Sequence, residues 1–189
     1  QNMIYTSGTT GHPKGVRRFA PTPEQTANAE RMRSLIYGLN QMKPGDHFNV
    51  IRFDDTMDQL FADAVPADKE NIDRAKAFVS RLNANGGTEM IPPMRAALMD
   101  SHASDTSHLR QVVFLTDGAI GNEEQLFATI SKGLGRSRVY MVGIGSAPNS
   151  FLMSRVAETG RGTFTQIGSP DQVDERMRAL FEKLEQPVV

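Results

Sequence analysis

Hydroxyl and carboxylate side chains are concentrated in three short loops that lie far apart in the sequence. The loops cover residues 5–11, 86–89 and 116–123. The first and third follow apolar runs typical of buried strands, and the second leads into a helical pattern. Because ligands of a doubly wound sheet bind beyond the carboxyl ends of its strands, we expect these loops to meet there. Their side chains offer oxygen donors of the kind that Mg²⁺ prefers, namely Ser7, Thr9, Thr88 and Asp117.

Two of these residues also have an ordinary structural interpretation. Asp117-Gly118 after a strand is typical of a turn, and the aspartate is a good N-cap for a following helix. Thr88 is likewise a good N-cap for a helix that starts at about Glu89. Their joint placement at the ends of neighbouring strands is what favours a metal site. Such a site carries few negative charges, so a carboxylate from a partner protein can complete the coordination of the ion.

Strand-like and helix-like runs alternate along almost the whole chain. Short apolar runs, expected of strands buried on both faces of a parallel sheet, cover residues 3–6, 48–53, 111–116, 139–144 and 163–167. Residues 57–65 alternate between apolar and polar, which predicts a short edge strand that ends at Pro66. The sequence therefore predicts a doubly wound α/β fold with a mostly parallel sheet and helices on both faces.

The helices are expected from their caps and apolar stripes. Thr22-Pro23-Glu24-Gln25 is a capping box with proline at the first helical position, so a helix begins there. Its stripe is Ala29, Met32, Ile36 and Leu39. A further helix is expected from about Glu89 to Leu98, and the other stripes are Ile72, Ala75, Val79 and Leu82; Leu126, Ile130 and Leu134; Leu152 and Val156; and Val173, Met177, Leu180 and Leu184.

Length and composition exclude several classes of function. The 189 residues, of which 39% are hydrophobic and 23% charged, are expected to form a single domain over residues 1–189. The net charge of -1 gives no reason to expect nucleic acid as a partner. No apolar run is long enough to insert into a membrane. The chain has no cysteine, which excludes disulfides and thiolate chemistry, and its start at Gln1 is expected of a fragment or processed chain.

From about residue 43 to the end, the sequence resembles a von Willebrand factor A domain. The motifs that carry the resemblance are Lys-Pro-Gly-Asp-His-Phe-Asn-Val-Ile-Arg-Phe at 43–53, Asn-Gly-Gly-Thr-Glu-Met at 85–90 and Val-Phe-Leu-Thr-Asp-Gly at 113–118. The type it most resembles is the bacterial relatives of inter-alpha-trypsin inhibitor heavy chains. The resemblance implies a sheet with one antiparallel edge strand and a metal-ion-dependent adhesion site, in which Thr88 and Asp117 occupy the second and third loops.

The same resemblance implies a role in adhesion rather than catalysis. The expected partner is a protein that presents an acidic residue to the bound Mg²⁺, and the domain is expected to be a monomer in an extracytoplasmic or cell-surface location. The first loop departs from the family pattern, which is Asp-x-Ser-x-Ser. Ser7 and Thr9 match the hydroxyl positions, but Tyr5 stands where the aspartate belongs. Losing that carboxylate predicts a degenerate site that binds Mg²⁺ weakly or not at all.

Residues 3–18 resemble a different family, the adenylate-forming enzymes such as acyl-CoA synthetases. The run Met-Ile-Tyr-Thr-Ser-Gly-Thr-Thr-Gly-His-Pro-Lys-Gly-Val-Arg-Arg is similar to their phosphate-binding loop. The resemblance implies contacts to ATP phosphates from Thr6, Ser7, Gly8, Thr9, Thr10, Gly11 and Lys14. The chain thus resembles a chimera with an atypical N-terminal segment at 1–42, which supplies the first strand, glycine loop and helix. A flexible surface loop at 7–11 remains an open alternative.

Catalysis is not expected from this sequence. Beyond residue 40 the chain has no counterpart of the adenine pocket, substrate pocket or second lysine of an adenylate-forming enzyme. It also has no paired carboxylates or Ser-His-Asp arrangement in a convincing context. Asp54-Asp55 is typical of a turn after a strand. His102 and His108 fall in a polar stretch at 101–108, which we expect to be a solvated loop rather than a zinc site.

Overall fold

A computed structural model describes residues 23–81, 89–117, 121–145 and 149–185 of the chain. Its centre is a parallel sheet with the strand order β5-β6-β7. The strands are β5 (Arg110–Thr116), β6 (Ser137–Ile144) and β7 (Phe164–Ile167). All three coincide closely with runs predicted from the sequence, and β6 is buried along nearly its whole length, as expected of a central strand with helices on both faces.

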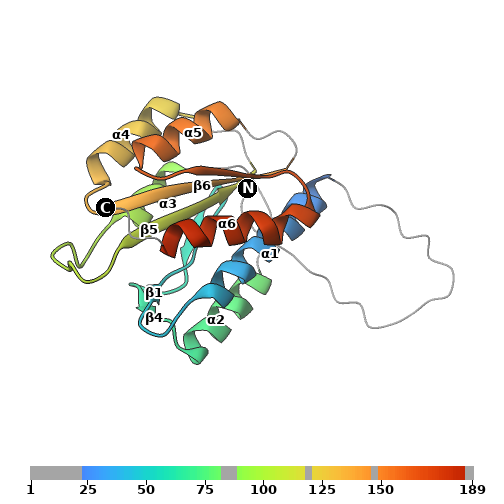
Figure 1. Ribbon diagram of the computed structural model, residues 1–189. Coiled ribbons are helices and arrows are strands. Elements are labelled where there is room, and N and C mark those ends of the chain that lie inside the picture. Colours follow the sequence, from blue (N-terminus) through green and yellow to red (C-terminus); the bar gives the residue numbers. More distant parts are fainter. Residues whose placement is uncertain (1–22, 82–88, 118–120, 146–148, 186–189) are drawn as a thin grey trace.

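Helices cover both faces of this sheet, as Figure 1 shows. Alternate strand residues point to opposite sides, because side chains in a strand have a period of two. Phe114 and Met141 pack with α3 (Ile91–Leu98), α4 (Glu123–Gly133) and α5 (Ser150–Thr159). Leu115 and Val142 pack on the other side with α1 (Pro23–Gln41) and α6 (Val173–Glu185), and the short helix η1 (Pro170–Gln172) precedes α6. The doubly wound α/β fold is confirmed.

The segment that follows α1 forms two small antiparallel pairs. Strand β1 (His47–Phe48) pairs with β4 (Val65–Pro66), and β2 (Ile51–Phe53) pairs with β3 (Met57–Gln59). The antiparallel pairing predicted for residues 57–65 is thus present, but each predicted strand is split in two, and both pairs form two-stranded sheets of their own. Together with α2 (Lys69–Ser80) and part of α1, residues of β1 and β4 and of the neighbouring loops enclose a third apolar cluster.

A side chain explains why the run at 48–53 is interrupted. The Oδ1 atom of Asn49 accepts hydrogen bonds from the backbone amides of Val50 at 2.8 Å and Phe61 at 3.1 Å. Its Nδ2 atom donates to the Phe61 carbonyl at 2.8 Å. These bonds take the place of ladder bonds at this point, so β1 and β2 are separate elements.

The helix predicted from the capping box is present as α1, and its predicted stripe is only partly confirmed. Ala29 is exposed, whereas Met32, Ile36 and Leu39 pack against the cluster around α2. A second face of α1, which includes Ala27, is buried toward α6 and the sheet. None of the described helices is long and apolar enough to cross a membrane.

Candidate functional site

The carboxylate of Asp117 directly follows β5, at the carboxyl end of the parallel sheet. The N-terminal half of α1 lies at this same end (Figure 1). From there Arg31 Nη1 donates to Asp117 Oδ1 at 2.8 Å. The arginine side chain is 0% exposed and the aspartate side chain 19% exposed, so the pair is largely shielded from water. Asn28 Oδ1 accepts a second hydrogen bond from Arg31 Nη2, which fixes the guanidinium further.

A second carboxyl group is buried one residue before this arginine. Glu30 is 1% exposed, and its Oε2 atom has no hydrogen-bond partner among the described residues. Burial raises the pKa of Glu30 above its ordinary value of 4.5; the charge of Arg31 opposes that rise and the charge of Asp171 adds to it. Asp171 belongs to η1, which follows β7. Three acidic side chains therefore approach the carboxyl end of the sheet from different elements.

One oxygen of the Asp117 carboxylate is engaged by a cation of the protein itself. A neighbouring positive charge weakens the attraction of a carboxylate for a metal cation. Arg31 places a guanidinium at hydrogen-bond distance, so the carboxylate is already neutralised by the protein's own cation. Within the described ranges, no group of three His, Cys, Asp or Glu side chains is arranged to hold a metal ion.

The other predicted site residues lie outside the described residues. This holds for Ser7, Thr9 and Thr88 of the metal site and for Thr6, Gly8, Thr10, Gly11 and Lys14 of the phosphate-binding alternative. Of the predicted metal ligands, the structure therefore places Asp117 alone, at the expected end of the sheet.

The two capping interpretations of the sequence are wrong. The N-cap of α4 is Asn122, in a left-handed conformation with φ 52°, and not Asp117. The N-cap of α3 is Met90, so this helix begins after the position at which Thr88 was expected to cap it. Asp117 thus forms a long-range ion pair with Arg31 and does not cap α4.

The polar stretch at 101–108 is a loop, as predicted, and lies at the opposite end of the sheet. Asp100 holds it in place by accepting hydrogen bonds from Arg136 Nε at 2.6 Å and Nη2 at 3.4 Å. The ring of His108 stacks edge-on against His47, with centroids 5.4 Å apart, and its Nδ1 lies 2.8 Å from Asp105 Oδ2.

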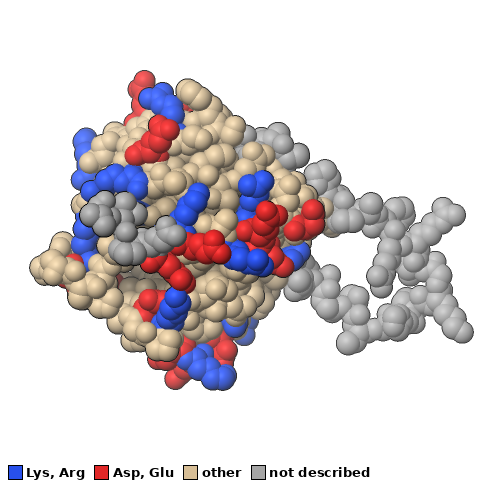
Figure 2. Space-filling view, viewed as in Figure 1, with Lys and Arg blue, Asp and Glu red and all other residues tan. Residues whose placement is uncertain are grey.

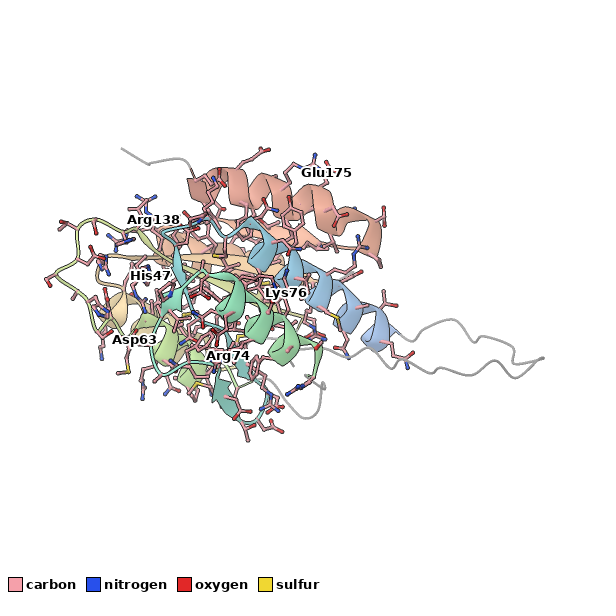
Figure 3. All side chains as sticks on the ribbon, turned by 90° about the horizontal axis from the view of Figure 1, so that it is seen from below. His47, Asp63, Arg74, Lys76, Arg138 and Glu175 are labelled. Carbon is pink, nitrogen blue, oxygen red and sulfur yellow. The ribbon has the colours of Figure 1, made fainter. Side chains whose placement is uncertain are left out.

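Figure 3 shows His47, Asp63 and Arg138, near the start of β6, at the same end of the molecule, while Glu175 of α6 lies toward the other end. This histidine pair is therefore remote from the candidate site around Asp117.

Sequence reasoning missed the part played by Arg31. The apolar stripe predicted for α1 pointed to other positions, and a charged residue inside a helix is usually solvated. A signal was nevertheless present, because Glu30 and Arg31 lie between the apolar residues Ala27 and Leu35, which face α6 and the sheet.

The model of the von Willebrand factor type A domain family matches residues 24–165. The match includes α1, so the boundary expected near residue 43 is too late. A von Willebrand factor A domain-containing protein of Dictyostelium discoideum is 28% identical over 152 residues, which are 80% of this chain and 16% of that protein. The von Willebrand factor A domain-containing protein 5A of Rattus norvegicus is 26% identical over 162 residues, 82% of this chain and 20% of that protein. This chain thus spans about a fifth or less of these curated relatives.

Solved structures agree with the fold. The structure of a von Willebrand factor type A protein from Catenulispora acidiphila superposes with a TM-score of 0.71 at 22% identity, over 81% of this chain and 37% of that one. At this level of identity, the likeness supports the arrangement of strands and helices.

Proposed function

Because this chain belongs to the von Willebrand factor type A domain family, we propose that it is a protein-binding module with a degenerate metal-ion-dependent adhesion site. The observation that carries the second half of this proposal is the ion pair between Arg31 and Asp117. In a metal-dependent site, the ion supplies the positive charge that a partner's acidic residue binds. Here a guanidinium already pairs with the carboxylate, so we expect Mg²⁺ binding to be weak or absent and partner binding not to depend on the metal.

The charge distribution is consistent with a protein partner rather than with a nucleic acid. On the face that Figure 2 shows, Lys and Arg side chains are interspersed with Asp and Glu side chains, with no broad basic patch. We further propose that the domain is a monomer without catalytic activity, of the type related to bacterial inter-alpha-trypsin inhibitor heavy chains, in an extracytoplasmic or cell-surface location. The family resemblance supports these finer assignments.

Calorimetric titration of the chain with Mg²⁺ and with Mn²⁺ tests the proposal. We expect no saturable heat at millimolar metal, and the same trace for Asp117→Asn as for the unchanged chain. A dissociation constant in the micromolar range or tighter, lost in Asp117→Asn, shows that the carboxylate does serve a metal and overturns the proposal.

A second candidate function is phosphate binding by residues 6–14. It is supported by the resemblance of residues 3–18 to the phosphate-binding loop of adenylate-forming enzymes, and these residues precede the family match, which begins at residue 24. If the loop binds phosphate, ATP or pyrophosphate raises the melting temperature without added metal, and Lys14→Ala abolishes the rise. Unchanged melting in millimolar pyrophosphate counts against this candidate and leaves the binding-module proposal intact.

A further inference from the structure

Phe151 is a large aromatic side chain that the fold leaves in solvent. It lies in the first turn of α5 and is 73% exposed. The helix is oriented by its other face, where Leu152 and Val156 are buried, and by Asn149, whose side chain accepts from the Leu152 amide at 3.1 Å. Phe151 therefore contributes little to the core. A single exposed apolar residue is ordinary, so its neighbours decide whether it has a role.

One turn later, Arg155 spans two aromatic rings from two helices. Its guanidinium carbon lies 5.9 Å from the ring centroid of Phe151 and 5.3 Å from that of Phe127 on α4. Phe127 is partly buried against the core, so it anchors the guanidinium from the interior side. Both distances are within the range of cation–π attraction, which restrains the arginine before any partner arrives.

Arg155 forms no ion pair with any carboxylate in the described part of the chain. Other arginines do find such partners, as Arg33 does with Asp174, Arg52 with Asp54 and Arg136 with Asp100. Stacking on rings uses the faces of a guanidinium and leaves the N–H groups at its edge able to donate. An arginine held in this way is suited to bind a carboxylate through two parallel hydrogen bonds.

The surface lies at the end of the sheet where ligands of this fold class bind. Helix α4 follows β5 and helix α5 follows β6, so both helices begin at the carboxyl end of the strands. Figure 1 shows the first turn of α5 at that end. Phe151 thus faces solvent on the same end as Asp117, whose own positive partner, Arg31, is buried and unable to reach a ligand.

We propose that Phe151, Arg155 and the accessible edge of Phe127 form a docking surface for a peptide segment of a partner protein that carries an acidic residue next to an apolar one. The carboxylate binds the edge of the Arg155 guanidinium, and the apolar neighbour covers the Phe151 ring. Aromatic and arginine side chains are the residue types that most often dominate binding energy at protein interfaces. This inference rests on the proposed function, because it identifies which chemistry the binding module recognises once a metal is not the acceptor.

The test uses a display library of random 12-residue peptides selected on the full chain, in buffer with EDTA. Enriched peptides are synthesised with a fluorescent label, and their affinity is measured by anisotropy. We expect enriched sequences to pair Asp or Glu with Leu, Ile or Phe. Phe151→Ala and Arg155→Met are each expected to weaken binding by about tenfold or more.

Two matched variants control for exposure and for the arginine–aromatic contact. Met99 is also 73% exposed, and Arg74 lies 4.9 Å from the ring centroid of Phe61 on the opposite part of the molecule, where Figure 3 labels it on α2. Met99→Ala and Arg74→Met are expected to change affinity by less than about twofold. Melting temperatures of all four variants verify folding.

The outcomes separate this inference from the proposed function. If the enriched peptides bind Phe151→Ala and Arg155→Met as tightly as the unchanged chain, the proposed binding function stands but this docking surface is overturned. A failure to enrich acidic–apolar sequences overturns it as well. Selection that succeeds only with Mg²⁺ or Mn²⁺ contradicts the proposed metal-independent function. The peptides selected in this way are then titrated against Arg155→Met. Weaker binding by this variant supports the docking surface, and unchanged binding overturns it.

Discussion

The guanidinium of Arg31 on α1 lies 2.8 Å from the carboxylate of Asp117, a residue 86 positions later in the chain. Two charges that are shielded from water stabilise a fold only as a pair, because removing one leaves the other buried and uncompensated. Asp117→Asn or Arg31→Met is therefore expected to lower the free energy of unfolding by about 3 kcal/mol, measured by urea denaturation.

The double variant Arg31→Met/Asp117→Asn distinguishes this pairing from a general sensitivity of the region. It removes both charges, so we expect it to be more stable than either single variant and to recover about half of the loss. If the two single losses simply add, the residues do not act as a pair.

Glu30 makes stability fall as the pH rises. Its folded-state pKa is raised, chiefly by burial, so between pH 4.5 and that raised pKa the folded state binds more protons than the unfolded state. The stabilising contribution of the neutral carboxyl is full below the unfolded pKa and is lost as the pH rises through the folded pKa. Glu30→Gln keeps the shape and removes the titration.

We therefore expect Glu30→Gln to gain stability relative to the unchanged chain as the pH increases from 4 to 7.5. The difference in melting temperature between the two proteins measures this effect. Carboxyls with a lowered pKa, such as Asp54 and Asp100, contribute equally to the pH dependence of both proteins, so their contributions cancel. A difference that stays constant across this range shows that Glu30 is ionised in the fold as it is in the unfolded chain.

The sequence predicted the fold correctly where a helix packs against the core on one side only. In α6 the predicted stripe of Val173, Met177, Leu180 and Leu184 is buried throughout, because this helix packs against one layer. In α1 the prediction was only partly right, because the helix packs against α2 on one side and against α6 and the sheet on another. A helix with two buried faces has no single stripe to detect.

The site was predictable only as far as topology determines it. The position of Asp117 at the end of a buried strand follows from the order of strands and helices. Its partner does not, since the local pattern of α1 places Arg31 on the face of Ala27 and Leu35 but gives no sign of a partner 86 positions away. Long-range pairing depends on the angle at which α1 crosses the sheet, and local patterns of hydrophobicity leave that angle undetermined.

The close contact between the end of α5 and the start of β6 requires glycine. A Cβ atom at Gly162 would lie 2.0 Å from the Val139 carbonyl oxygen, which is backbone and cannot move aside cheaply. Gly162→Ala is expected to lower the free energy of unfolding by about 2 kcal/mol or more. Gly121→Ala is the control, because a Cβ there meets no atom of the described residues within 4 Å, and we expect a change below about 0.5 kcal/mol. Equal urea midpoints for the two variants contradict this account.

Asn49 is expected to be the residue that holds the β1–β4 and β2–β3 pairs in register. Its side chain binds the amide of Val50 and both the amide and the carbonyl of Phe61, so its loss leaves three backbone groups without these partners. Asn49→Ala should therefore cost about 2 kcal/mol in unfolding free energy, since each unsatisfied, partly buried group carries a desolvation penalty. Gln59→Ala removes only an exposed bond of 3.3 Å to the Ala62 carbonyl and should cost less than about 0.5 kcal/mol.

Hydrogen exchange of the Phe61 amide gives the local measurement: it should accelerate in Asn49→Ala and not in Gln59→Ala. Unchanged protection of that amide means that the backbone pairs hold without the asparagine, and that the break between β1 and β2 has another cause.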